Sequence, residues 1–158
     1  KENINYRGVL YFGLMITDKG PFVLEYNVRF GDPETQVILP RMETDLVELM
    51  ECVCEGQLSK IDIKWKEDKC VCVILSSAGY PGQYEKGKEI KGIEKVKDVI
   101  IFHSGTKKEH NKFYTNGGRV LGITAIGTTM EQARQRVYKA AEIIDFEGKH
   151  YRKDIAVK

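Results

Sequence analysis

The segment Phe22–Phe30 carries three polar residues at every second position, Glu25, Asn27 and Arg29. Because side chains alternate across a β-strand, a strand here places a carboxylate, an amide and a guanidinium in a row on one face, about 7 Å apart. Mg²⁺ prefers hard oxygen ligands, usually one or two from the protein together with phosphate oxygens and water. Glu25 and Asn27 supply such oxygens, and Arg29 can neutralise a phosphoryl or carboxylate group. The row is suited to chemistry on phosphate groups.

Two further carboxylates, Asp32 and Glu34, follow directly after this segment. Pro33 cannot donate a hydrogen bond to a sheet, so the strand is expected to end in a turn at Gly31–Glu34. The alternation has a second interpretation, in which the polar row is simply the solvent-facing side of an antiparallel sheet. The cluster of carboxylates beyond Arg29 favours a site.

A second candidate is the glycine-rich turn Thr115–Arg119, which leads into a predicted strand. Glycine permits positive φ and close approach of the backbone, so the amide groups around Gly118 and the Arg119 side chain could hold a phosphate. The alternative is an ordinary hairpin turn. The segment Gly79–Tyr84 is expected to form a turn with Pro81 and Gly82 at its centre, and Lys107–Lys112 a solvated hairpin loop.

The polar row needs a hairpin to position it. The apolar run Val9–Ile16 predicts a strand that is buried on both faces, and Thr17–Pro21 has turn chemistry. The second strand is expected to bury its apolar side, which would fix the register of the polar side. The residues of that apolar side are Phe22, Leu24, Tyr26, Val28 and Phe30.

The remaining pattern predicts an α+β protein with mostly antiparallel strands. One helix is expected from Asp45 to Glu55, with Asp45 as N-cap and Gly56 after its end, and another from Met130 to Ile144, with Thr128 in its capping box. A polar stretch between them suggests two domains, residues 1–60 and 61–158. Strands are expected at Cys70–Leu75, Glu89–Ile93, Val99–Phe102, Lys112–Thr115 and Arg119–Ile126.

Composition excludes several classes of partner. The 158 residues carry a net charge of 25 − 23 = +2, which gives no electrostatic reason to expect nucleic acid. The longest apolar run is too short to span a bilayer, so no membrane partner is expected. The four cysteines form two Cys-x-Cys pairs, Cys52 with Cys54 and Cys70 with Cys72, which are expected to be reduced, packed thiols of a cytoplasmic protein rather than metal ligands.

The run Glu25–Gln36 resembles the signature of the glycinamide ribonucleotide synthetases, also called phosphoribosylamine–glycine ligases. Its Glu-x-Asn-x-Arg core is shared by ATP-grasp enzymes, and the continuation Phe-Gly-Asp-Pro-Glu is more particular to this family. Further resemblances extend the similarity over residues 6–155. They lie at Gly8–Met15, Gly79–Gly82, Phe102–Thr106, Asn116–Leu121 and Tyr151–Ile155.

The resemblance implies an ATP-dependent ligase of purine biosynthesis, in which glycine is activated as glycyl phosphate and then joined to 5-phosphoribosylamine. It assigns Glu25 and Asn27 to Mg²⁺ or Mn²⁺, with Arg29 as a catalytic residue. Asp32 is expected to bind substrate, with the charge of the glycine ammonium group as its partner. Gly118 and Arg119 are expected to bind the phosphate of phosphoribosylamine.

The same resemblance implies that residues 1–60 are the end of an ATP-grasp domain, an antiparallel sheet with a helix, and 61–158 a small C-terminal α+β domain. Such ligases are much longer, so the chain is expected to act with the remainder of a parent chain and to be inactive alone. Two alternatives stay open: part of another ATP-grasp carboxylate–amine ligase, or a noncatalytic binding or assembly module.

Overall fold

The computed structural model describes residues 2–157. They form two compact units. The first contains the chain up to Thr35 together with Met42–Lys66, and the second contains Gln36–Arg41 together with the chain from Glu67 onward. Helices combine with antiparallel strands, which confirms the α+β class. No helix among the described residues is long and apolar enough to cross a membrane.

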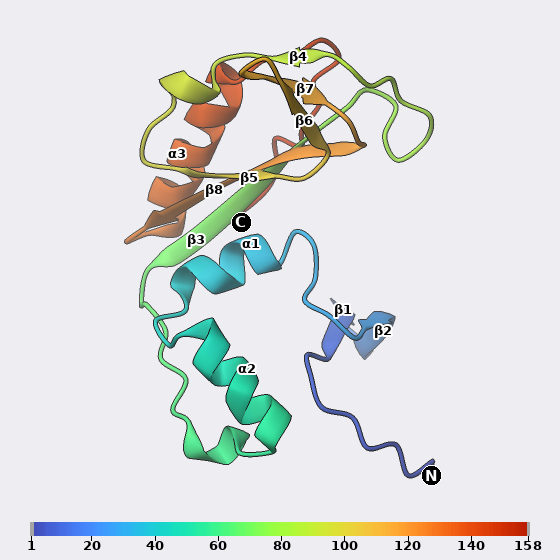
Figure 1. Ribbon diagram of the computed structural model, residues 1–158, viewed down its shortest axis with the longest axis vertical. Helices are drawn as coiled ribbons and strands as arrows, with labels where there is room; N and C mark the ends of the chain where they lie inside the picture. The colour runs from blue at the N-terminus through green and yellow to red at the C-terminus, as the bar shows by residue number, and fades with distance from the viewer. Residues whose placement is uncertain (1, 158) are drawn as a thin grey trace. The chain divides into compact units, whose positions relative to one another are not determined.

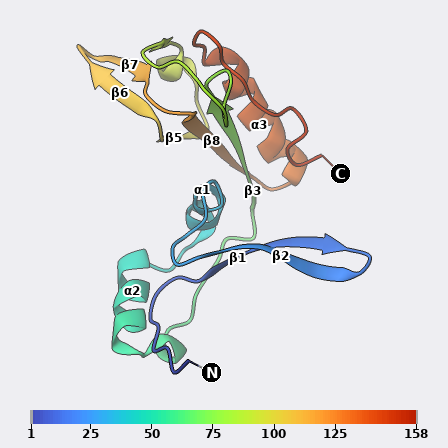
Figure 2. The ribbon, with the colours of Figure 1, turned by 90° about the vertical axis from the view of Figure 1, so that its right-hand side faces the viewer.

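The first unit contains a hairpin of strands β1 (Tyr11–Thr17) and β2 (Gly20–Asn27), seen as a long ribbon in Figure 2. The strand pairing confirms that Glu25 and Asn27 share one face of β2, because they lie opposite alternate residues of β1. The expectation that the strand continues to Phe30 is wrong, since β2 ends at Asn27 and Arg29 lies beyond it.

The register of the hairpin changes in the middle. Gly13 lies opposite Glu25, but the next residue, Leu14, lies opposite Val23. Leu24 is therefore an extra residue on β2, which is a β-bulge. The bulge puts the alternation of side chains out of phase between the two halves of the strand.

The bulge and the exposed surface overturn the prediction of one buried apolar side on β2. Phe22 lies opposite Met15 and Tyr26 opposite Phe12, and these two β1 residues are three positions apart, so they point to opposite faces. Phe22 is 52% and Tyr26 63% exposed. The β1 run, expected to be buried on both faces, is also exposed at Leu14, Met15 and Ile16. A sheet of two strands has too little neighbouring structure to bury such residues.

Helix α2 (Leu46–Glu55) of the first unit confirms the predicted caps. Asp45 accepts hydrogen bonds from the backbone N–H groups of Val47 (2.8 Å) and Glu48 (3.2 Å). Gly56 ends the helix in the left-handed conformation at φ 71°. A short helix α1 (Thr35–Ile38), which the sequence analysis did not include, precedes it and begins at the end of the loop after β2.

The second unit is built on a sheet in the order β3 (Lys69–Ser76), β8 (Arg119–Gly127) and β5 (Ile100–His103), all antiparallel (Figure 1). Helix α3 (Met130–Ile143) packs on one face of this sheet. Its N-cap is Thr129, which accepts from the Gln132 N–H at 3.1 Å, so the expected role of Thr128 is wrong.

The core of the second unit lies between α3 and the central strand. Residues of β3 and β8 that face each other across the sheet are buried together, among them Val73 with Ile123 and Leu75 with Leu121. Small residues of α3 allow the helix to approach closely. The buried helix residues are Ala133, Val137, Ala140 and Ala141.

A second sheet has the order β4 (Glu89–Ile90), β7 (Lys112–Thr115) and β6 (Thr106–Glu109). The predicted loop at Lys107–Lys112 is therefore wrong in part, because β6 pairs with β7 and only His110 and Asn111 form the turn, both at positive φ. The turn Thr115–Arg119 joins β7 of this sheet to β8 of the other, so it is not an ordinary hairpin turn.

Candidate functional site

The end of β2 brings Glu25 and Asn27 together with Tyr11 and Gly13 of β1, because these residues lie opposite one another in the hairpin. Glu25 is exposed and Asn27 is half-buried. A Cβ atom at Gly13 would lie 2.8 Å from Cγ of Glu25. Glycine at this position therefore leaves the room in which the Glu25 side chain lies across β1.

The loop after β2 folds back onto β1. Tyr11 Oη donates a hydrogen bond to Glu34 Oε1 at 3.0 Å. Gly31 packs closely between these two groups, since a Cβ atom there would collide with the Glu34 carboxylate and lie 3.1 Å from the Tyr11 ring. The Thr35 N–H donates to the Gly31 carbonyl at 3.0 Å and closes the loop.

Arg29 and Asp32 lie in the same loop. The guanidinium of Arg29 donates from Nη1 to the carbonyl of Phe30 at 2.7 Å, and both Arg29 and Asp32 are exposed. Four of the six predicted site residues thus belong to β2 and the loop that follows it. The other two, Gly118 and Arg119, belong to the second unit.

Charges converge on the Tyr11 phenol. The hydrogen bond to Glu34 raises the pKa of Tyr11 above its usual value of 10, and the negative charges of Glu34 and Glu25 act in the same direction, while Arg29 opposes them. The two carboxylates and the guanidinium are therefore near enough to act on one group. Sequence reasoning missed Tyr11 and did not include Glu34 among the site residues.

We expect the Glu34→Gln substitution to lower the pKa of Tyr11 toward 10, because it removes the charged acceptor that stabilises the protonated phenol. Tyrosine labelled with ¹³C at Cζ reports this titration by NMR, and Tyr11→Phe identifies the signal. Glu48→Gln, which removes the same charge from the exposed surface of α2, should leave the Tyr11 midpoint in place. An unchanged Tyr11 midpoint in Glu34→Gln would contradict the hydrogen bond.

The donor set fits a hard divalent cation. Glu25 offers a carboxylate and Asn27 an amide oxygen on the same face of β2. The described residues contain no group of three or more His, Cys, Asp or Glu side chains placed to hold a metal ion. A cation here would therefore complete its shell with phosphate oxygens and water, as Mg²⁺ and Mn²⁺ commonly do.

The amide of Asn27 has one unusual feature. Its Nδ2 atom is buried and has no hydrogen-bond partner. Such an unsatisfied donor is costly in a half-buried position, and an acceptor such as a phosphate oxygen would satisfy it.

The four cysteines form no disulfide bond among the described residues. Cys54 is exposed and the other three are half-buried, so they are less deeply packed than the sequence predicted. Cys70 and Cys72 lie on β3, on the face opposite to its buried core residues.

Comparison with known proteins places both parts of the chain in one family. The C domain of phosphoribosylglycinamide synthetase matches residues 70–158, and the ATP-grasp (A) domain of the same enzyme matches residues 1–35. A phosphoribosylamine–glycine ligase of Caldanaerobacter subterraneus is 53% identical over 156 residues, and one of Synechocystis is 46% identical over 162. The chain spans 37% and 39% of the length of these relatives.

Solved structures agree. The crystal structure of phosphoribosylamine–glycine ligase from Thermotoga maritima superimposes with a TM-score of 0.78 at 42% identity, over 92% of this chain and 36% of that one. The biotin carboxylase domain of 2-oxoglutarate carboxylase from Hydrogenobacter thermophilus shares the fold with a TM-score of 0.57 at 15% identity, over 87% of this chain and 31% of that chain. From the match to more than half of its length, the chain belongs to the phosphoribosylglycinamide synthetase family.

Proposed function

We propose that this chain is part of an ATP-dependent ligase that joins glycine to 5-phosphoribosylamine and gives glycinamide ribonucleotide for purine biosynthesis. The observation that carries the proposal is that Glu25 and Asn27 lie on the same face of β2, near Arg29 and Glu34. A relative that bears this enzyme's name matches 99% of the chain. The shared face of Glu25 and Asn27 supports the ligase over a noncatalytic module, which has no need of two oxygen ligands on one face.

The ligase requires the remainder of a parent chain. Relatives are much longer, and the exposed apolar residues of the hairpin are suited to pack against further strands of an ATP-grasp sheet. We assign residues 1–60 to the end of that ATP-grasp domain and 61–158 to the C-terminal domain. Cysteines that form no disulfide among the described residues suit the cytoplasm, where thiols stay reduced.

The residues at the end of β2 serve the first half of the reaction. Glu25 and Asn27 would hold Mg²⁺ or Mn²⁺, which supplies charge neutralisation between ATP and a carboxylate. Arg29 holds the γ-phosphoryl group while the glycine carboxylate attacks it and ADP leaves, forming glycyl phosphate. Asp32 pairs with the glycine ammonium group and so orients the attacking carboxylate.

In the second half, the amine of phosphoribosylamine attacks the carbonyl carbon of glycyl phosphate. The new C–N bond forms, the C–O bond to phosphate breaks, and phosphate leaves as the amine loses a proton. Arg119 and the backbone at Gly118 hold the 5-phosphate of the ribose, so that the amine is presented at a fixed distance from the phosphate anchor.

The full-length ligase that contains this chain tests the proposal. We expect release of phosphate from ATP only when glycine and 5-phosphoribosylamine are both present, in a one-to-one ratio with glycinamide ribonucleotide measured by mass spectrometry. The 158-residue chain alone should release none. Equal turnover with a different carboxylate and amine would assign the chain to another ATP-grasp ligase instead.

A further inference from the structure

Three loops of the second unit meet where β3 and β5 end and β8 begins. They are the loop Ser77–Tyr84 after β3, the turn Ser104–Gly105 after β5 and the turn Asn116–Gly118 before β8. Short hydrogen bonds join them. Ser77 N–H donates to the Gly118 carbonyl at 2.8 Å, Ser77 Oγ to the Gly117 carbonyl at 2.9 Å, and Asn116 N–H to the Gly105 carbonyl at 2.7 Å.

Glycine is required where these loops touch. Gly118 is buried against the ring of Tyr80, and a Cβ atom there would overlap the ring at Cδ2. Gly105 and Gly117 are also in close backbone contact, since a Cβ on Gly105 would lie 2.5 Å from the Cα of Gly117. The ring of Tyr80 is thereby held at a fixed place beside the residue that precedes Arg119.

Tyr80 also contacts the Arg119 side chain directly. Arg119 Nε donates a hydrogen bond to Tyr80 Oη at 2.9 Å, and the Arg119 Cζ atom lies 5.9 Å from the centroid of the Tyr80 ring. A hydrogen bond at Nε fixes the plane of the guanidinium and therefore the direction of its Nη groups, which match the oxygens of a phosphate.

We propose that Tyr80 is a positioning residue that orients the Arg119 guanidinium toward the phosphate of 5-phosphoribosylamine. This role rests on the proposed function of the ligase, and Tyr80 acts through Arg119 without touching the substrate. The phenol hydroxyl supplies the orientation, while the ring supplies the packing on Gly118. The two contributions are separable, because phenylalanine keeps the ring and lacks the hydroxyl.

The test is Tyr80→Phe in the full-length ligase. We expect the KM for 5-phosphoribosylamine to rise about fivefold to tenfold, which corresponds to the net contribution of one ordinary hydrogen bond, with kcat and the KM values for glycine and ATP changed less than about twofold. A purely structural role would alter all of these values or the Tm.

Tyr84→Phe is the matched control. Its ring lies 6.4 Å from that of Tyr80, and its hydroxyl makes no hydrogen bond with the described residues.

Arg119→Ala separates this inference from the proposed function. If Arg119→Ala raises the KM for phosphoribosylamine and Tyr80→Phe does not, the positioning role of Tyr80 is overturned. If Arg119→Ala leaves that KM unchanged, the phosphate role of Arg119 fails, and the Tyr80 inference fails with it. In the double variant, Tyr80→Phe should add nothing to the effect of Arg119→Ala, whereas additive effects would contradict action through Arg119.

Discussion

The Glu25→Gln substitution in the full-length ligase is expected to reduce kcat about a hundredfold or more, with a smaller change in the KM for glycine. The amide keeps the size of the carboxylate and removes its charge. A metal ion at a phosphoryl-transfer site contributes several kcal/mol of charge stabilisation, and a loss of about 3 kcal/mol corresponds to about a hundredfold in rate. Steady-state phosphate release at saturating ATP measures the effect.

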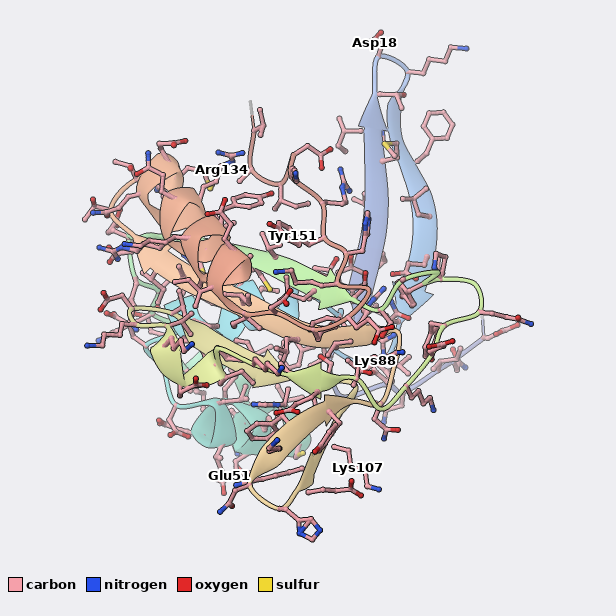
Figure 3. The ribbon with its side chains drawn as sticks, turned by 90° about the horizontal axis from the view of Figure 1, so that it is seen from above. Asp18, Glu51, Lys88, Lys107, Arg134 and Tyr151 are labelled. Atoms are coloured by element: carbon pink, nitrogen blue, oxygen red, sulfur yellow. The ribbon has the colours of Figure 1, made fainter. Side chains whose placement is uncertain are left out.

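Asp18→Asn provides the matched control for this substitution. Asp18 is an exposed carboxylate on the same hairpin, in the turn at its far end (Figure 3). Removing its charge should leave kcat within about twofold, because it lies outside the group of residues around Tyr11. The Mn²⁺ concentration needed for half-maximal activity should rise in Glu25→Gln and stay constant in Asp18→Asn. Equal rates for the two variants would remove Glu25 from the metal site.

Local signals in the sequence predicted local structure well. Asp45 and Gly56 were expected to delimit a helix, and both serve as its caps. Capping depends on a few residues of contiguous chain, so it can be predicted from the sequence alone. The N-cap of α3 was misplaced by one position, from Thr129 to Thr128, because both hydroxyl residues precede the same apolar stripe.

The hairpin shows what local signals cannot give. The alternation of Phe22, Leu24 and Tyr26 suggests one uninterrupted face, yet the bulge at Leu24 divides it. A bulge is set by pairing with the opposite strand, so the sequence of β2 alone carries little trace of it. The burial of the apolar residues of β1 and β2 was overestimated, because burial depends on neighbouring structure that the sequence of two strands does not specify.

The composition of the site was predicted in part. Glu25 and Asn27 were identified by period-two spacing and lie on one face as expected. Tyr11 and Glu34 were missed as a pair because 23 residues separate them, and only the register of the hairpin brings Tyr11 opposite Asn27. Given that register, the resemblance over Gly8–Met15 could have indicated Tyr11 as a neighbour of Glu25 and Asn27, the proposed metal ligands.

In the second unit, Ile123→Ala is expected to lower the free energy of unfolding by about 3 kcal/mol. Ile123 is fully buried at the centre of β8, opposite Val73 of β3 and Ile101 of β5. Truncation removes apolar contacts and leaves a cavity beneath α3. Strand β8 is paired on both sides, so it cannot move to close this cavity. With an m-value of about 1.5 kcal/mol per M, the urea midpoint should fall by about 2 M.

Ile100→Ala is the control for this loss, because it makes the same chemical change at a residue that is 40% exposed on the edge strand β5. Its cost should stay below about 1 kcal/mol, since water already reaches the side chain and little cavity forms. Backbone NMR signals of β3 and β8 during urea unfolding report on the second unit alone. Similar urea midpoints for the two variants would mean that Ile123 does not lie in a rigid core. In that case the packing of β8 would not hold Arg119, the first residue of β8, in place. The hydrogen bonds of the neighbouring loops at Ser77 and Gly105 would have to do so instead.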